Sequence, residues 1–221
     1  ALMSRELITR YPRILKYTSI WLSSLREGKS FLRNTNELIK IYPGADGLKT
    51  GHTAEAGFCL SATAKQKNLR LISVIMGASS EKERLVETQK LLNYGFRSFE
   101  RFKLASKGER APGKIRIRGG RRETVVPVLK KDFYVLVPKG QGELVETRVI
   151  PVKNLKAPVA EGETVARMAA ILKGEKVAEV ELIAPEKIAR ANIIVLAWRW
   201  MRDLFFGWIP SRKIKPDFAD Y

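Results

Sequence analysis

The spacing of apolar residues changes near residue 102 of this 221-residue chain. Before that point, two runs of small and β-branched residues at 58–64 and 69–76 are separated by a short polar break, and a helical pattern follows over 81–96. After it, short β-rich runs alternate with turns that contain Gly or Pro, as far as residue 185. The first part therefore predicts a hairpin followed by a helix, whereas short strands at the spacing seen after residue 102 are typical of a small all-β sandwich-like domain.

We therefore expect three segments, at residues 1–102, 103–185 and 186–221. The last segment holds three of the four Trp residues and predicts an amphipathic helix over 186–209. Its longest apolar run, 193–198, is far shorter than the roughly 20 residues that a membrane span requires. This balance favours a helix lying on an anionic membrane surface, while a helix packed on the protein and a true span are the alternatives. Three polar residues share one narrow stripe of the helix: Asn192, Arg199 and Asp203.

The first ten residues have helical periodicity, which Pro12 ends because the residue before a proline is pushed out of the α region. The chain opens inside this pattern and without Met. We therefore expect a part of a longer chain, with residues needed for its chemistry upstream. Residues 13–43 are predicted to be irregular or extended.

The charge balance favours an anionic partner. Lys and Arg number 41 against 23 Asp and Glu, for a net charge of +18, and the excess is spread over all three segments. The densest group alternates with Ile115 and Ile117, which predicts the solvent face of a strand, with contact to a polyanion as the alternative. No nucleic-acid-binding motif accompanies these residues, so we expect no nucleic acid. The group consists of Lys114, Arg116, Arg118, Arg121 and Arg122.

The chain has one cysteine, Cys59, and one histidine, His52. One cysteine forms no intramolecular disulfide, and the common zinc ligand sets need more Cys and His than this. We therefore expect neither a metal nor a cofactor.

A glycine-rich run at 44–57 contains the residues most indicative of a chemical function. It contains Asp-Gly-Leu-Lys-Thr-Gly-His-Thr at 46–53 and Ala-Gly-Phe at 56–58, followed by the strand and helix of 69–96. This run resembles the Lys-Thr-Gly strand of the serine D-alanyl-D-alanine carboxypeptidases, which are low-molecular-mass penicillin-binding proteins. The resemblance extends over the whole chain. It implies the end of a penicillin-recognising, β-lactamase-like α/β domain, then a β-rich domain and a C-terminal membrane anchor.

The resemblance also implies roles for individual residues. Lys49 and Thr50 would bind the terminal carboxylate of the substrate, and Gly51 would let the acyl group lie along the strand. The backbone N–H of His52 would be one of two donors to the oxyanion, with its ring lining the site. Arg84 matches an arginine that lines the family's site, although a plain surface arginine is the alternative.

Two elements of the family pattern are missing. The serine nucleophile and its lysine partner come from an upstream Ser-x-x-Lys, and this sequence has no Ser-x-Asn. Its one Ser-x-x-Lys string, from Ser79 to Lys82, follows the Lys-Thr-Gly and stands at a predicted helix start, where Ser is favoured as a cap. We therefore expect no catalytic residue in this chain, which should be inactive alone.

The resemblance implies a carboxypeptidase that removes the terminal D-Ala from peptidoglycan stem peptides through an acyl-serine, is inhibited by β-lactams and uses no cofactor. It further implies an exported protein on the outer face of the bacterial cytoplasmic membrane, held there peripherally by residues 186–209. The competing hypothesis is a non-enzymatic, basic membrane-surface scaffold that binds an anionic polymer or a protein.

Overall fold

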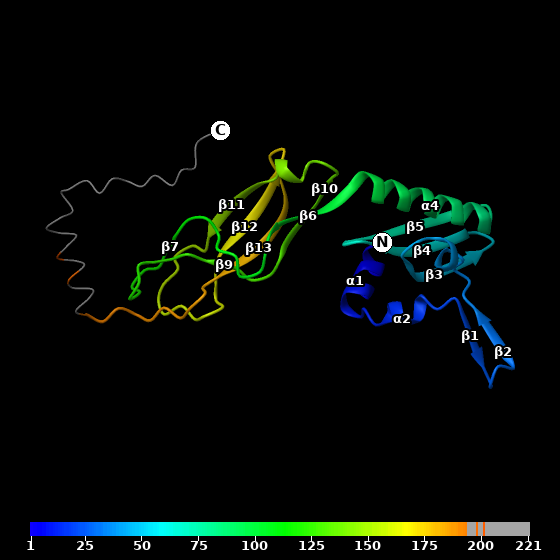
Figure 1. The fold of residues 1–221 in the computed structure, drawn as a ribbon, viewed down its shortest axis with the longest axis horizontal. Coiled ribbons are helices and arrows are strands. Elements are labelled where there is room, and N and C mark those ends of the chain that lie inside the picture. The colour runs from blue at the N-terminus through cyan, green and yellow to red at the C-terminus, as the bar shows by residue number, and fades with distance from the viewer. Residues whose placement is uncertain (194–197, 199–200, 202–221) are drawn as a thin grey trace. The chain divides into compact units, whose positions relative to one another are not determined.

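The computed structural model describes residues 1–193, 198 and 201 (Figure 1). The chain divides into two compact units. Unit 1 contains residues 1–101 and 137–139, and unit 2 contains residues 102–136 and the described residues from 140 onward. Within the described residues, no helix has the length and apolar character needed to cross a membrane.

Unit 1 is built on a three-stranded antiparallel sheet in the order β3-β4-β5, with a separate two-stranded hairpin, β1-β2, projecting from it (Figure 1). The elements in chain order are α1 (Leu2–Arg10), α2 (Ile14–Thr18), β1 (Leu22–Leu25), β2 (Ser30–Arg33), α3 (Leu38–Ile41), β3 (Ala45–Thr53), β4 (Gly57–Gln66), β5 (Leu69–Ala78) and α4 (Glu81–Ser98).

The two faces of the central strand β4 have different neighbours, because successive side chains of a strand point to opposite faces. Leu60, Ala62 and Ala64 are buried in one apolar core with residues of α3 and α4. Ser61 lies on the other face, where its hydroxyl is 2.7 Å from that of Ser4 on α1. The core therefore lies between the sheet and the α3 and α4 helices.

The start and the close packing of α4 follow from two small residues. Ser80 is the N-cap, and its hydroxyl oxygen accepts a hydrogen bond from the backbone N–H of Glu83 at 3.1 Å. Near the other end, a Cβ on Gly95 would lie 2.5 Å from the Cδ1 atom of Leu71 on β5. Gly95 therefore lets this helix approach the sheet closely.

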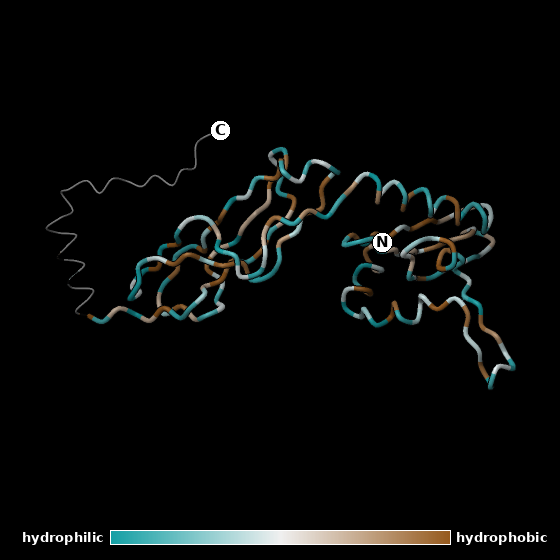
Figure 2. The backbone as a smooth tube through the Cα atoms, in the orientation of Figure 1, coloured by the Kyte–Doolittle hydropathy of each residue, from teal (hydrophilic) through white to brown (hydrophobic). Residues whose placement is uncertain are grey.

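Unit 2 is mostly β structure. Its largest sheet has the order β11-β12-β13-β9, β7 pairs with β8, and β10 pairs with β6. Figure 2 shows apolar positions recurring along the strands, with hydrophilic turns between them. The elements that lie wholly or partly in unit 2 are β6 (Phe99–Ala105), β7 (Ile115–Arg116), β8 (Thr124–Val125), β9 (Val128–Leu129), β10 (Phe133–Pro138), the 3₁₀ helix η1 (Gly142–Leu144), β11 (Glu146–Pro151), β12 (Thr164–Leu172) and β13 (Glu175–Ile183).

The α/β unit followed by a β-sandwich-like domain agrees with the expected fold class. Residues 13–43 are more ordered than predicted, because this segment forms the helices α2 and α3 and the β1-β2 hairpin. The β-rich sequence at 124–129 forms two short strands, β8 and β9, on either side of Pro127, since proline cannot donate to a strand ladder.

The start of the predicted last helix is wrong. Residues 186–192 are not helical, and Ile188 is 3% exposed, with its backbone paired to that of Val159. Burial and pairing with a distant segment override the helical spacing here. Apart from 193, 198 and 201, the predicted helix beyond 192 lies outside the described residues.

Candidate active site on strand β3

Strand β3 carries the Lys-Thr-Gly sequence and is an edge strand. Within the described residues β4 is the only strand that pairs with it, so its other edge has no partner strand. At the start of β3, the carbonyl oxygens of Asp46 and Gly47 accept hydrogen bonds from the side chains of Thr18 and Asn36. Lys49 lies opposite Ser61, and His52 lies opposite Phe58. An edge strand offers unpaired backbone groups to an added extended peptide.

Lys49 and Thr50 leave the strand on opposite faces, since they are consecutive residues. Lys49 is exposed, and its Nζ donates to the carbonyl oxygen of Thr50. Thr50 is 8% exposed, and its hydroxyl lies 2.7 Å from that of Thr35. The chain therefore holds the threonine hydroxyl in place and leaves the ammonium group at the surface.

Gly51 faces open space. A Cβ at this position would meet no described atom within 4 Å, and the residue is exposed. Packing within the described chain thus does not require glycine here. The space beside the strand is free for the backbone or acyl group of a bound molecule.

His52 and Arg84 come together through Phe58. The rings of His52 and Phe58 have centroids 4.0 Å apart, and the guanidinium carbon of Arg84 is 6.0 Å from the centroid of Phe58. Arg84 is 5% exposed, so it is not a plain surface arginine. Its Nη2 is 3.9 Å from a carboxylate oxygen of Glu81, while its buried Nε has no hydrogen-bond partner among the described residues.

A short loop before α3 supports β3, and the sequence pattern did not reveal it. Thr35 bonds to Thr50 as described, and Asn36, 2% exposed, donates from Nδ2 to the carbonyl oxygen of Gly47 at 3.1 Å. Asn34 accepts a bond from the backbone N–H of Asn36 at 2.9 Å. The only sequence signal is a cluster of Asn and Thr ahead of an apolar run, which is also typical of ordinary turns and caps.

The Ser-x-x-Lys string after β5 is a helix start. Ser79 donates both its hydroxyl and its backbone N–H to a carboxylate oxygen of Glu83, at 2.5 and 2.6 Å. The bond from the Ser79 hydroxyl, followed by that from its N–H, holds the pKa of Glu83 below its ordinary value. The Ser79 hydroxyl is thus bound to a carboxylate rather than to Lys82, as expected for a residue that serves the helix start.

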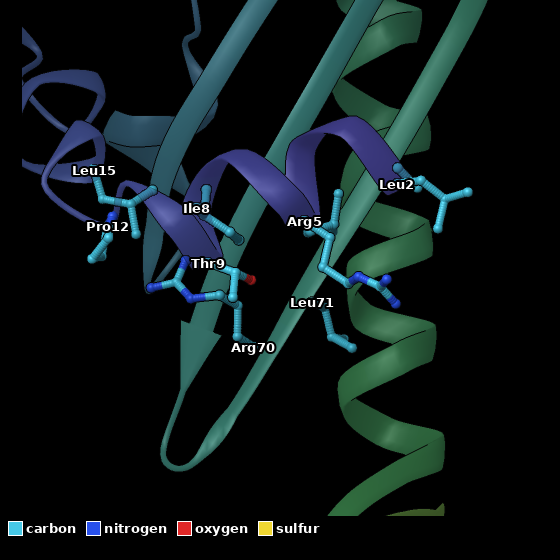
Figure 3. A pocket seen from close by; sticks show the side chains of 10 residues that line it. Leu2, Arg5, Ile8, Thr9, Pro12, Leu15, Arg70 and Leu71 are labelled. Carbon is cyan, nitrogen blue, oxygen red and sulfur yellow. The ribbon is translucent and has the colours of Figure 1, made fainter.

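A separate hollow of about 610 Å³ lies between α1 and β5 (Figure 3). Its lining is largely apolar and includes Ile8, Leu15 and Leu71. Arg70 in its wall is paired through both guanidinium Nη atoms with the carboxylate of Asp46, at 2.8 and 2.7 Å. The guanidinium group of Arg70 is therefore already bound within the chain. Among the described residues, no cluster of His, Cys, Asp and Glu is able to hold a metal ion.

Comparisons with known proteins identify relatives of this chain. Residues 1–80 match the family described as D-alanyl-D-alanine carboxypeptidase, and residues 99–190 match the family described as penicillin-binding protein 5, C-terminal domain. The D-alanyl-D-alanine carboxypeptidase DacF of Bacillus subtilis is 35% identical over 207 residues, covering 92% of this chain and 53% of the relative. DacA of Escherichia coli is 30% identical over 164 residues, covering 74% of this chain and 40% of the relative.

Solved structures agree as well. Penicillin binding protein 5 from Haemophilus influenzae aligns with a TM-score of 0.72 at 33% identity, over 86% of this chain and 55% of that one. These matches define the class as that of the low-molecular-mass penicillin-binding proteins. Within that class, the chain belongs to the family of D-alanyl-D-alanine carboxypeptidases. It spans about half the length, or less, of the curated relatives that it matches.

Proposed function

We propose that the complete protein is a serine-type D-alanyl-D-alanine carboxypeptidase that removes the terminal D-Ala from peptidoglycan stem peptides. The observation that carries this proposal is the Lys-Thr-Gly sequence on an open-edged strand, in a chain of this family. The proposed substrate is an extended peptide that ends in a carboxylate. β-Lactams are the proposed inhibitors.

The residues of β3 suit such a substrate. Lys49 supplies an exposed ammonium group for a charge-assisted hydrogen bond with a carboxylate. Thr50, whose largely buried hydroxyl lies beside that of Thr35, is proposed as a second donor to this group. The open space beside Gly51 admits the acyl part of the peptide as an added strand. In this proposal the backbone N–H of His52 is an oxyanion donor, and the loss of one such donor typically lowers a rate by about 100- to 1,000-fold.

We propose that the nucleophilic serine and its lysine partner belong to sequence outside residues 1–221. The one Ser-x-x-Lys string present has its first hydroxyl bound to Glu83, and a nucleophile needs a base instead. The role of this chain is then to bind and orient the substrate. Its boundaries, at 1–102, 103–185 and 186–221, are proposed to separate the catalytic part, the β-rich domain and the anchor.

The proposed location is the outer face of the cytoplasmic membrane after export. The support is the amphipathic, Trp-rich sequence of 186–209 together with the excess of basic residues. In this proposal the protein is held peripherally at an anionic membrane surface and has no role with nucleic acid.

The test is the intact mass of two chains after incubation with a penicillin: this chain, and a version extended upstream to include any in-frame Ser-x-x-Lys. We expect only the extended chain to gain the mass of one penicillin. Adduct formation on this chain, lost in Ser79→Ala, would contradict the role given to Ser79. If neither chain reacts, the non-enzymatic scaffold is the better hypothesis.

A second arm tests the substrate-binding role. In the extended chain, Lys49→Gln should lower the rate of acylation by about 10- to 100-fold, since a hydrogen bond to a charged group contributes roughly 1.5–3 kcal/mol. Lys65→Gln is the matched control, because Lys65 is an exposed lysine of the neighbouring strand β4. Equal rates for the two variants would argue against carboxylate binding by Lys49.

A further inference from the structure

Three segments of unit 2 alternate between buried apolar and exposed basic residues. In the first, Ile115 and Ile117 are 5% and 2% exposed, while Arg116 and Arg118 between and after them are exposed. The second segment repeats the pattern, with Lys156 exposed between buried Leu155 and Ala157. In the third, exposed Lys187 precedes buried Ile188, and exposed Arg190, two residues further on, donates from its Nε to the carbonyl oxygen of Ala157 at 3.1 Å. Each segment therefore directs its positive charges outward.

Backbone contacts hold these three segments side by side. Arg118 pairs with Lys156 in a parallel bridge, and Gly120 pairs with Arg190 in an antiparallel bridge. The backbone N–H of Ala191 donates to the carbonyl oxygen of Gly119 at 2.9 Å. Residues more than 35 positions apart in the chain thus form one surface, close to β7 in Figure 1. We call this surface the basic face; it is formed by Lys114, Arg116, Arg118, Lys156, Lys187 and Arg190.

The basic face keeps most of its charge. No described carboxylate lies within ion-pair distance of Arg118 or Lys156. By contrast, cations nearer the middle of β13 are neutralised, since Lys130 pairs with Glu181 and Arg167 with Glu179. Carboxylates occur at the margin of the face as Glu123 and Glu186, of which Glu186 is bound by Arg122.

We propose that the basic face binds the anionic headgroups of a phospholipid bilayer, as a second membrane contact beyond residues 186–209. Cations presented on a rigid surface attract anionic lipid within about one Debye length of the membrane. A bilayer fits better than a free polymer because the chain leaves this face at residue 191 directly into its amphipathic, Trp-rich sequence. The inference rests on the membrane location proposed above, and it assigns the β-rich unit a lipid-binding role of its own.

The experiment compares two variants of the full chain that lose the same charge from the same unit. Arg118→Gln with Lys156→Gln removes two neighbouring cations of the basic face. Arg148→Gln with Lys173→Gln is the matched control, because these exposed cations lie toward the opposite end of the β12-β13 hairpin. Binding is measured by cosedimentation with vesicles of mixed phosphatidylcholine and phosphatidylglycerol, and with phosphatidylcholine alone, over a series of NaCl concentrations.

We expect the basic-face variant to bind mixed vesicles about 30-fold more weakly than the unmodified chain, since each basic residue near an anionic surface changes binding roughly fivefold. The control should lose much less, and the difference should vanish at high salt. Equal losses in both variants, or an unmodified chain that ignores anionic vesicles, would overturn the proposal. If the basic-face variant bound vesicles as well as the unmodified chain does, but bound a soluble phosphodiester polymer more weakly, the choice of a bilayer would be overturned. Penicillin is absent throughout, so failure here is distinct from failure of the enzyme proposal.

Discussion

Replacing Asn36 by Ala should destabilise unit 1 far more than its size suggests. The side chain is 2% exposed and makes two hydrogen bonds, donating to the carbonyl oxygen of Gly47 at 3.1 Å and accepting from the backbone N–H of Leu38 at 3.3 Å. The substitution leaves both backbone groups without this partner in a site with little access to water. Each such group costs about 1–3 kcal/mol, so the two together predict a total loss of roughly 2–6 kcal/mol.

Native-state hydrogen exchange of the whole chain, read on peptides of β4, measures this loss. A change of 2–6 kcal/mol corresponds to a roughly 30- to 25,000-fold fall in protection. Asn68→Ala is the matched control, because Asn68 is exposed and its amide donates to the carbonyl oxygen of Arg101 at 3.3 Å. That change should cost no more than about 0.5 kcal/mol. If both variants lose the same protection, burial of the Asn36 amide does not support β3, and the reasoning is refuted.

Three further predictions concern β3 and α4. In the extended, active chain, Thr35→Val removes the hydrogen-bond partner of the Thr50 hydroxyl and should lower kcat/KM by about 2- to 10-fold. Thr35→Ser keeps a hydroxyl and should restore kcat/KM, whereas unchanged kinetics in Thr35→Val would argue against a positioning role for Thr35. Gly95→Ala places a Cβ 2.5 Å from Cδ1, at the end of the Leu71 side chain, which packs against the core. Moving this side chain costs about 1–3 kcal/mol, which offsets or exceeds the ~1 kcal/mol gained in helix propensity, so the thermal midpoint should not rise; a rise would contradict this. The stabilisation that Glu83 gives to the start of α4 should be present above its ordinary pKa of 4.5 and be lost as the pH falls through its lowered folded-state pKa. Hydrogen exchange of α4 in the unmodified chain and in Glu83→Gln should therefore differ near neutrality and converge in acid.

Short-range patterns in the sequence were sufficient for several elements. The expected hairpin and helix are β4, β5 and α4, and the helix over the first ten residues is α1. The exposed and buried alternation around Arg116 and Arg118 is as predicted. In these places local propensity and burial act in the same direction, so spacing alone is informative.

Features that depend on contacts between distant segments could not be predicted from the sequence. Residues 186–192 have helical spacing, yet the pairing of Ile188 with Val159 holds them extended. The strand β12 is hard to recognise from the sequence, because its buried positions include small residues such as Ala166 and Ala170, which are not typical of strands. The bond between Thr35 and Thr50 joins residues 15 positions apart, and no spacing rule predicts it. Likewise, the burial of Arg84 against Phe58 depends on how α4 packs on the sheet.

The open edge of β3 has a consequence for self-association. An exposed strand edge pairs readily with another copy of itself, and proteins often prevent this by placing a lysine there. Lys49 stands near the middle of the edge with its charge at the surface. Two copies that approached edge to edge would bring their ammonium groups together in a place where neither is neutralised. Lys49, which is proposed to bind a carboxylate, would thus also keep two copies of the protein from pairing their sheets. A peptide that ends in a negative charge, by contrast, is attracted to this edge.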